Sequence, residues 1–161
     1  MGSGKSTVGK AMAEVIRWDF RDTDQMVMDE AGLSISEIFE RHGESRFRLM
    51  ESSALEATFK SQPIIVATGG GLPCHHNNLE KMKANGLVIF IDVPIDILVD
   101  RLADSSDRPL AHGDTDSRRT QLKRLLDDRI EIYRKAHLSI DGAPSTRFVV
   151  DEIVGHLESF L

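Results

Sequence analysis

The amino-acid sequence begins with residues that can bind phosphate groups. Gly2-Ser3-Gly4-Lys5-Ser6-Thr7 fills the last places of the pattern G-x-x-x-x-G-K-[ST], in which glycines let backbone N–H groups point toward phosphate oxygens. Lys5 can place a positive charge on the β- and γ-phosphates of a nucleotide, and the Ser6 hydroxyl can ligate Mg²⁺. Apolar residues recur at helical spacing from Val8 to Ile16. The segment therefore predicts a phosphate-binding loop followed by a helix.

Two further groups of residues that could do chemistry follow predicted strands. Asp22 and Asp24 come after a short strand predicted at 18–21, and on an extended segment their carboxylates point the same way. One can serve a metal ion and the other a substrate hydroxyl; the alternative is a helix N-cap. Gly69-Gly70-Gly71 follows an apolar strand predicted at 64–68, and its N–H groups can approach a ligand closely. The alternative for the glycines is a flexible turn.

Three arginines stand where they could bind anions. Arg48 lies on a predicted helix and suits a bidentate contact with a carboxylate; the alternative is a surface salt bridge. Arg108 lies in a polar segment, 105–117, that we predict to be a mobile loop able to close on a transferring phosphate. Arg134 lies close to the end of a charged helix predicted at 117–136.

Strands and helices alternate along the rest of the chain. Further helices are predicted at 34–43, 44–60, 78–85, 94–103 and 146–160, and further strands at 87–93 and 138–141. Such alternation is typical of an α/β fold, a parallel sheet with helices on both faces. Ligands bind such sheets at the carboxyl ends of the strands, where the aspartates and glycines stand.

Composition narrows the class of protein. The chain has 161 residues, which suits one domain, and 40% hydrophobic with 29% charged residues argues against disorder. A net charge of −6 disfavours a general nucleic-acid binder. A single cysteine, Cys74, excludes an internal disulfide and a multi-thiolate metal site, which fits a reducing, cytoplasmic setting. We expect neither a signal peptide nor a membrane span.

Taken in order, the motifs resemble those of the shikimate kinase family over nearly the whole chain. They are G-S-G-K-S-T, D-T-D, G-E-x-x-F-R-x-x-E (Gly43 to Glu51), G-G-G, R-P-L (Arg108 to Leu110) and Y-R-x-A (Tyr133 to Ala136). The resemblance implies a five-stranded P-loop fold of the nucleoside-monophosphate-kinase type. It also implies transfer of the ATP γ-phosphate, with Mg²⁺, to the 3-hydroxyl of shikimate on the pathway to aromatic amino acids. We expect one domain over 1–161, a lid at about 104–117, and a monomer that binds neither nucleic acid nor membrane.

The same resemblance implies a role for each candidate residue. Asp24, Lys5 and Arg108 would be catalytic, with Asp24 as the base that holds the substrate hydroxyl. Ser6 would ligate Mg²⁺, and Asp22 would do so through water. Shikimate would contact Asp24, Arg48, Gly70, Gly71 and Arg134. ATP would contact Gly2, Ser3, Gly4, Lys5, Ser6, Thr7, Arg101 and Arg108, with Arg101 stacking on adenine. Phe39 and Phe47 would wall the shikimate pocket, although core packing is the default for any phenylalanine.

Other functions fit parts of the sequence. A sister kinase such as gluconate kinase would share Gly4-Lys5-Ser6 but should lack Phe47-Arg48 and the three glycines at these positions. The intact set of Asp24, Lys5 and Arg134 argues against a binding protein that kept the fold without catalysis. The acidic charge disfavours a nucleic-acid or partner-binding module. A shortened kinase with impaired activity is the remaining alternative.

The family pattern has a central strand before the phosphate loop, and this sequence has no counterpart for it. Losing about four buried side chains at 1.5–3 kcal/mol each would remove roughly 6–12 kcal/mol, comparable with the whole stability of a domain. We therefore expect that Met1 is an internal methionine of a longer protein. Adding about ten residues that end in Gly-x should raise both the melting temperature and the affinity for ATP. Thermal melting and ATP titration of the two chains test this, and equal melting with normal turnover would contradict it.

Overall fold

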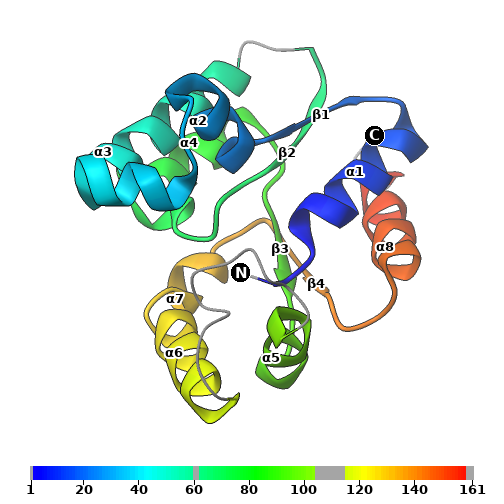
Figure 1. Cartoon of the computed structure of the whole chain (residues 1–161). Coiled ribbons are helices and arrows are strands. Elements are labelled where there is room, and N and C mark those ends of the chain that lie inside the picture. The colour runs from blue at the N-terminus through cyan, green and yellow to red at the C-terminus, as the bar shows by residue number, and fades with distance from the viewer. Residues whose placement is uncertain (1, 60–61, 104–114, 159–161) are drawn as a thin grey trace. The chain divides into compact units, whose positions relative to one another are not determined.

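The computed structural model describes residues 2–59, 62–103 and 115–158. The chain divides into two compact units, Lys5–Gly86 and, as the other, Met1–Gly4 together with Leu87–Leu161 (Figure 1). Within the described residues no helix is long and apolar enough to cross a membrane.

The unit Lys5–Gly86 holds two parallel strands and the helices that follow them. Its elements, in chain order, are α1 (Lys5–Ile16), β1 (Asp19–Asp22), α2 (Thr23–Ala31), α3 (Ile35–Thr58), β2 (Ile64–Ala67), the short 3₁₀ helix η1 (Leu72–Cys74) and α4 (Asn78–Asn85). The two strands pair in parallel from Asp19↔Ile64 to Asp22↔Ala67. Both strands therefore end at one edge, where Asp22 lies beside the start of the glycine segment.

The other unit repeats the strand-and-helix pattern. Its elements are β3 (Ile89–Asp92), α5 (Ile95–Ala103), α6 (Thr115–Asp127), α7 (Ile130–Tyr133), β4 (Leu138–Asp141) and α8 (Thr146–Glu158). The strands pair in parallel from Ile89↔Leu138 to Asp92↔Asp141. Before the strands begin, the Val88 carbonyl accepts from the His137 and Leu138 amides, and the Val88 amide donates to Nδ1 of His137 at 3.0 Å.

The four described strands form two separate two-stranded sheets, β1–β2 and β3–β4. Within the described residues, β2 and β3 each pair along one edge only. Ile64, Ile65 and Val66 of β2 are half-buried, whereas a strand inside a parallel sheet is buried on both faces. The parallel α/β architecture is confirmed.

Helix α3 carries Arg48, and its start and its interruption have clear local causes. A capping box opens it: the Ser34 hydroxyl accepts from the Glu37 amide, and the Glu37 carboxylate accepts from the Ser34 amide. The Ser34 amide and the Ser34 hydroxyl both donate to the Glu37 carboxylate, and these two hydrogen bonds lower the pKa of Glu37. Gly43, with φ 76° and ψ 169°, interrupts the helix, as the sequence predicted. Two helical segments result, and Arg48 lies in the second.

Buried side chains of α2 and α3 form a core cluster: Val27, Ile38, Phe47 and Ala54. Phe39 packs against this cluster, with its ring 4.7 Å from that of Phe47. Both phenylalanines therefore serve core packing, which is the default for this residue type.

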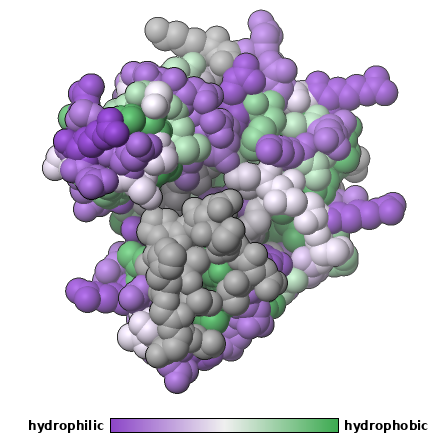
Figure 2. Space-filling view, viewed as in Figure 1, coloured by the Kyte–Doolittle hydropathy of each residue, from purple (hydrophilic) through white to green (hydrophobic). Residues whose placement is uncertain are grey.

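On the face shown in Figure 2, hydrophobic residues appear as separate patches in a largely hydrophilic surface.

One prediction about local structure is wrong. The charged helix expected at 117–136 is two helices, because α6 ends at Asp127 and α7 begins at Ile130. Asp127 and Asp128 have low intrinsic helix propensity, and two of them in succession disfavour continuing the helix.

Candidate functional site

The glycines of the predicted phosphate loop adopt the backbone that such a loop needs. Gly2 and Gly4 have φ of 76° and 80°, in the left-handed region that glycine adopts without strain. Helix α1 begins directly afterwards at Lys5, which confirms the predicted helix. Ser6 lies in its first turn beside the lysine, at the end of the helix that carries a partial positive charge. This combination is an anion-binding arrangement.

Asp22 joins the phosphate loop to the end of β1. The Ser6 hydroxyl donates to Oδ2 of Asp22 at 2.5 Å. The other carboxylate oxygen accepts from the Asp24 amide at 3.0 Å, which makes Asp22 the N-cap of α2. The expectation that both aspartates lie on an extended segment is therefore wrong, because the chain turns into a helix at Thr23. Asp22 combines the capping role with a contact to a potential metal-ligating hydroxyl.

Asp24 lies against the first of the three glycines. The Gly69 amide donates to the Thr23 hydroxyl at 3.1 Å. A Cβ atom at Gly69 would collide with Oδ1 of Asp24 and lie 2.7 Å from Oε1 of Glu51. Oδ1 of Asp24 is shielded from solvent. Two carboxylates thus converge on a position that only glycine can occupy.

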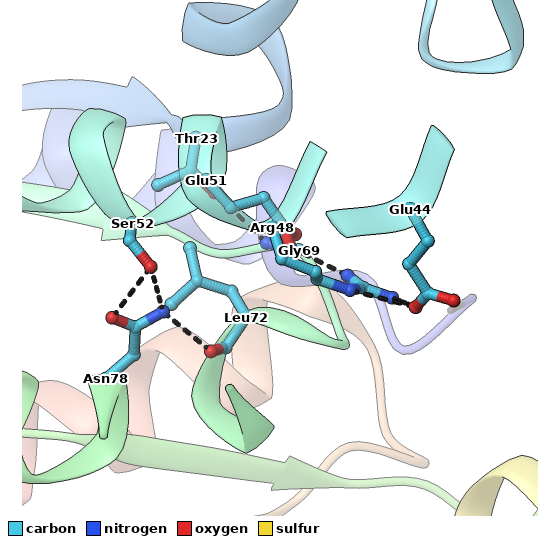
Figure 3. Close-up of polar contacts among 8 residues, drawn as sticks. All are labelled: Thr23, Glu44, Arg48, Glu51, Ser52, Gly69, Leu72 and Asn78. Atoms are coloured by element: carbon cyan, nitrogen blue, oxygen red, sulfur yellow. Dashed lines mark hydrogen bonds and ion pairs between the residues drawn. The ribbon is translucent and has the colours of Figure 1, made fainter. Parts of the chain in front are cut away.

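Arg48 is buried between two carboxylates of its own helix. Its Nη1 donates to Glu51 at 2.7 Å, while Nε and Nη2 donate to one oxygen of Glu44 at 3.1 and 2.8 Å (Figure 3). Only 9% of Arg48 is exposed, so the alternative of a surface salt bridge does not hold. Burial by itself lowers the pKa of the guanidinium, but the hydrogen bonds with Glu51 and Glu44 outweigh it and the pKa is raised. Arg48 is therefore a fixed positive charge.

The third glycine packs on this guanidinium. A Cβ atom at Gly71 would lie 2.5 Å from Nη1 of Arg48 and 2.9 Å from its Cζ. Gly71 is buried, whereas Gly70 between the two constrained glycines is half-exposed. A side chain at position 69 or 71 would therefore clash with its neighbours, which explains the glycine at both positions. This argues against the alternative of a merely flexible turn.

The remaining predicted residues lie at several places along the chain. Arg101 on α5 donates to the carbonyl oxygen of Gly142 at 3.0 Å. Arg134 follows α7, its side chain is 66% exposed, and it pairs with Glu131 at 3.2 Å. Arg108 and the predicted lid segment from 104 to 114 lie outside the described residues. In the loop and α1, Ser3 and Lys5 are half-buried, whereas Thr7 is exposed.

Glu51 and Thr23 are site residues to which the sequence reasoning gave no role. Glu51 closes the motif that begins at Gly43, three residues after Arg48. Side chains at i and i+3 share a helix face, so this spacing could have identified the ion pair. Thr23 is the middle residue of D-T-D, and its contact with Gly69 spans 46 residues. No local pattern marks such a contact.

Comparisons with known proteins identify what the chain is similar to. The family model for shikimate kinase matches residues 1–158. A shikimate kinase from Sulfurihydrogenibium sp. (strain YO3AOP1) is 39% identical over 155 residues, which cover 96% of this chain and 91% of that protein. A solved structure of shikimate kinase from Acinetobacter baumannii in complex with shikimate matches with a TM-score of 0.91 and 31% identity, over 99% of this chain and 89% of that one. A gluconokinase from Sinorhizobium meliloti 1021 has a TM-score of 0.57 and 19% identity over 99% of this chain and 88% of that one, so it shares the fold alone.

The contacts at Gly69 predict a large effect of one added methyl group. Gly69→Ala should lower the free energy of unfolding by about 1–3 kcal/mol, because the methyl group meets two carboxylates in a packed site. Gly86→Ala is the matched control, since a Cβ atom there has nothing within 4 Å. Urea unfolding of both variants measures the difference. Equal stability of the two variants would contradict the packing at Gly69.

Proposed function

The chain belongs to the shikimate kinase family, and on that premise we propose which of its residues carry out the phosphorylation of shikimate by ATP. The enzyme transfers the γ-phosphate of ATP to shikimate in the shikimate pathway. The observation that carries the assignment of residues is the convergence of Asp24, Arg48 and Glu51 on Gly69 and Gly71. A carboxylate that can hold a hydroxyl and a guanidinium that can hold a carboxylate match the two kinds of group on shikimate.

Arg48 binds the carboxylate of shikimate in this proposal. Its three hydrogen bonds to Glu44 and Glu51 use three of the five N–H donors of the guanidinium, and the others can donate to a ligand. Glu51 holds the guanidinium in place through Nη1, and Gly71 allows a ligand to approach its face. Arg134 supplies a second positive charge, and Gly70 contacts the ring hydroxyls.

Asp24 is the proposed base. Its carboxylate would accept the proton of the shikimate 3-hydroxyl while that oxygen attacks the γ-phosphorus and ADP leaves. The Asp22 cap and the packing at Gly69 hold Asp24 in the first turn of α2. Positioning of this kind, together with charge neutralisation, supplies most of the catalysis in phosphoryl transfer.

The phosphate loop and the end of β1 would hold the phosphates of ATP and Mg²⁺. Lys5 and the loop from Gly2 to Thr7 contact the phosphates. Ser6 and Asp22 offer the hard oxygen ligands that Mg²⁺ prefers. The 2.5 Å hydrogen bond places the Ser6 hydroxyl oxygen directly beside Oδ2 of Asp22. Among the described residues no cluster of three acidic, histidine or cysteine side chains could hold a metal, which suits an ion completed by phosphate oxygens. When bound, Mg²⁺ neutralises charge on the phosphates.

The remaining roles extend this proposal to the whole chain. Arg101 would stack on adenine, and Arg108, outside the described residues, would contact the phosphates. We further propose that residues 1–161 belong to one catalytic domain, as a monomer in the cytoplasm.

A coupled assay of ADP release, with shikimate and gluconate tested side by side, checks the activity and its base. Shikimate should be phosphorylated and gluconate should not. Asp24→Asn should abolish turnover of shikimate while largely preserving the fold, because the amide has the same shape but cannot take a proton. Near-normal turnover by the folded variant would contradict the assignment of the base.

The proposed carboxylate contacts predict a selective loss of binding. Arg48→Ala and Arg134→Ala should each weaken shikimate binding by about 2–5 kcal/mol and ATP binding far less, since a charged hydrogen bond is lost. Arg41→Ala is the matched control, because Arg41 lies on the same helix as Arg48 and pairs with exposed Glu37. Calorimetric titration with each ligand measures the effect. Equal weakening of both ligands would mean that the arginines are structural.

A further inference from the structure

A buried hydrogen-bonded pair links α3 to the turn that follows the glycines. Ser52 and Asn78 are only 7% and 0% exposed. The Ser52 hydroxyl donates to Oδ1 of Asn78 at 3.1 Å and accepts from its Nδ2 at 2.9 Å. Nδ2 of Asn78 also donates to the carbonyl oxygen of Leu72 at 3.0 Å (Figure 3). The pair therefore attaches the first residue of η1 to α3.

Both ends of this link lie next to Arg48. Ser52 follows Arg48 by four residues, so the two side chains lie on the same face of α3. Leu72 directly follows Gly71, which packs on the Arg48 guanidinium. The contacts form a closed ring that runs through Arg48, Ser52, Asn78, Leu72 and Gly71. A change at Asn78 must therefore alter how the glycine turn packs on Arg48.

The backbone before Asn78 makes this side chain the natural anchor. His76 and Asn77 have φ of 51° and 58°, a conformation that costs energy for residues other than glycine. Asn77, the N-cap of α4, makes no side-chain capping hydrogen bond. Such a backbone persists only where its surroundings fix it. The buried amide of Asn78 supplies fixed contacts directly after this strained turn.

We propose that Ser52 and Asn78 are positioning residues for shikimate: their buried hydrogen bonds hold the glycine turn where Gly71 and Arg48 together receive the substrate carboxylate. The inference rests on the proposed function, in which Arg48 contacts shikimate. Ser52 and Asn78 act through Leu72 and Gly71 and leave the phosphate loop unchanged.

The test compares Michaelis constants for the two substrates in single and double variants. Asn78→Ala should raise KM for shikimate about tenfold, and Ser52→Ala about threefold, because Asn78 keeps its bond to Leu72 in the second variant. For both variants kcat and KM for ATP should stay within about twofold of the parent. Ser52→Ala should have no added effect on KM when Asn78→Ala is already present, since Ser52 acts through Asn78.

Thr58→Ala is the matched control. Thr58 is another buried hydroxyl of α3, and it donates to the Leu55 carbonyl of its own helix rather than to the turn. It should lower the melting temperature without changing either KM. If Asn78→Ala fails to fold, the KM for shikimate of Ser52→Ala tests the inference by itself.

Two results would overturn the inference. One is a lower melting temperature with an unchanged KM for shikimate, which would make the pair a packing contact like Thr58. The other is a KM that rises equally for both substrates. Arg48→Ala separates the two proposals: if it raises KM for shikimate while Asn78→Ala and Ser52→Ala do not, only this inference fails. An unchanged KM in Arg48→Ala would overturn both.

Discussion

The buried ion pair between Arg48 and Glu51 determines which residues can surround it in the proposed substrate site. Their side chains are 11% and 2% exposed, and their atoms approach to 2.7 Å. Removing two charges from water costs several kcal/mol per ion, which is offset only by good geometry and further hydrogen bonds. Glu44 supplies such bonds to the other edge of the guanidinium. The helix must therefore hold three charged residues on one face, and it does so at spacings of three and four.

The same ion pair explains why the segment after β2 has no side chains at two positions. Gly69 and Gly71 lie where a Cβ atom would meet a carboxylate or the guanidinium. The charges thus determine the residue type of a segment about 20 positions further along the chain. In the phosphate loop the reason for the glycines is different: Gly2 and Gly4 have positive φ angles, which glycine adopts without strain.

Much of this site could be predicted from the sequence, because its motifs are local. The loop before α1, the interruption at Gly43 and the glycine run each appear in a few consecutive residues. What could not be predicted depends on contacts between distant residues. The pairing of Ser52 with Asn78 spans 26 residues, and the burial of Arg48 depends on the turn packed over it. Asp22 shows a further limit: D-T-D fits both an extended segment and a helix cap, and only the fold decides between them.

The interruption at Gly43 also divides α3 into two cooperative segments. Helical hydrogen bonds support one another along a continuous run, and a residue with non-helical angles ends that support. The segment before Gly43 can therefore fray without unwinding the segment that bears Arg48 and Glu51. In hydrogen-exchange terms, we expect the amide protons of residues 35–42 and those of residues 46–56 to exchange as two separate units. The break therefore separates any opening of the first segment from the segment that bears the proposed substrate contact at Arg48.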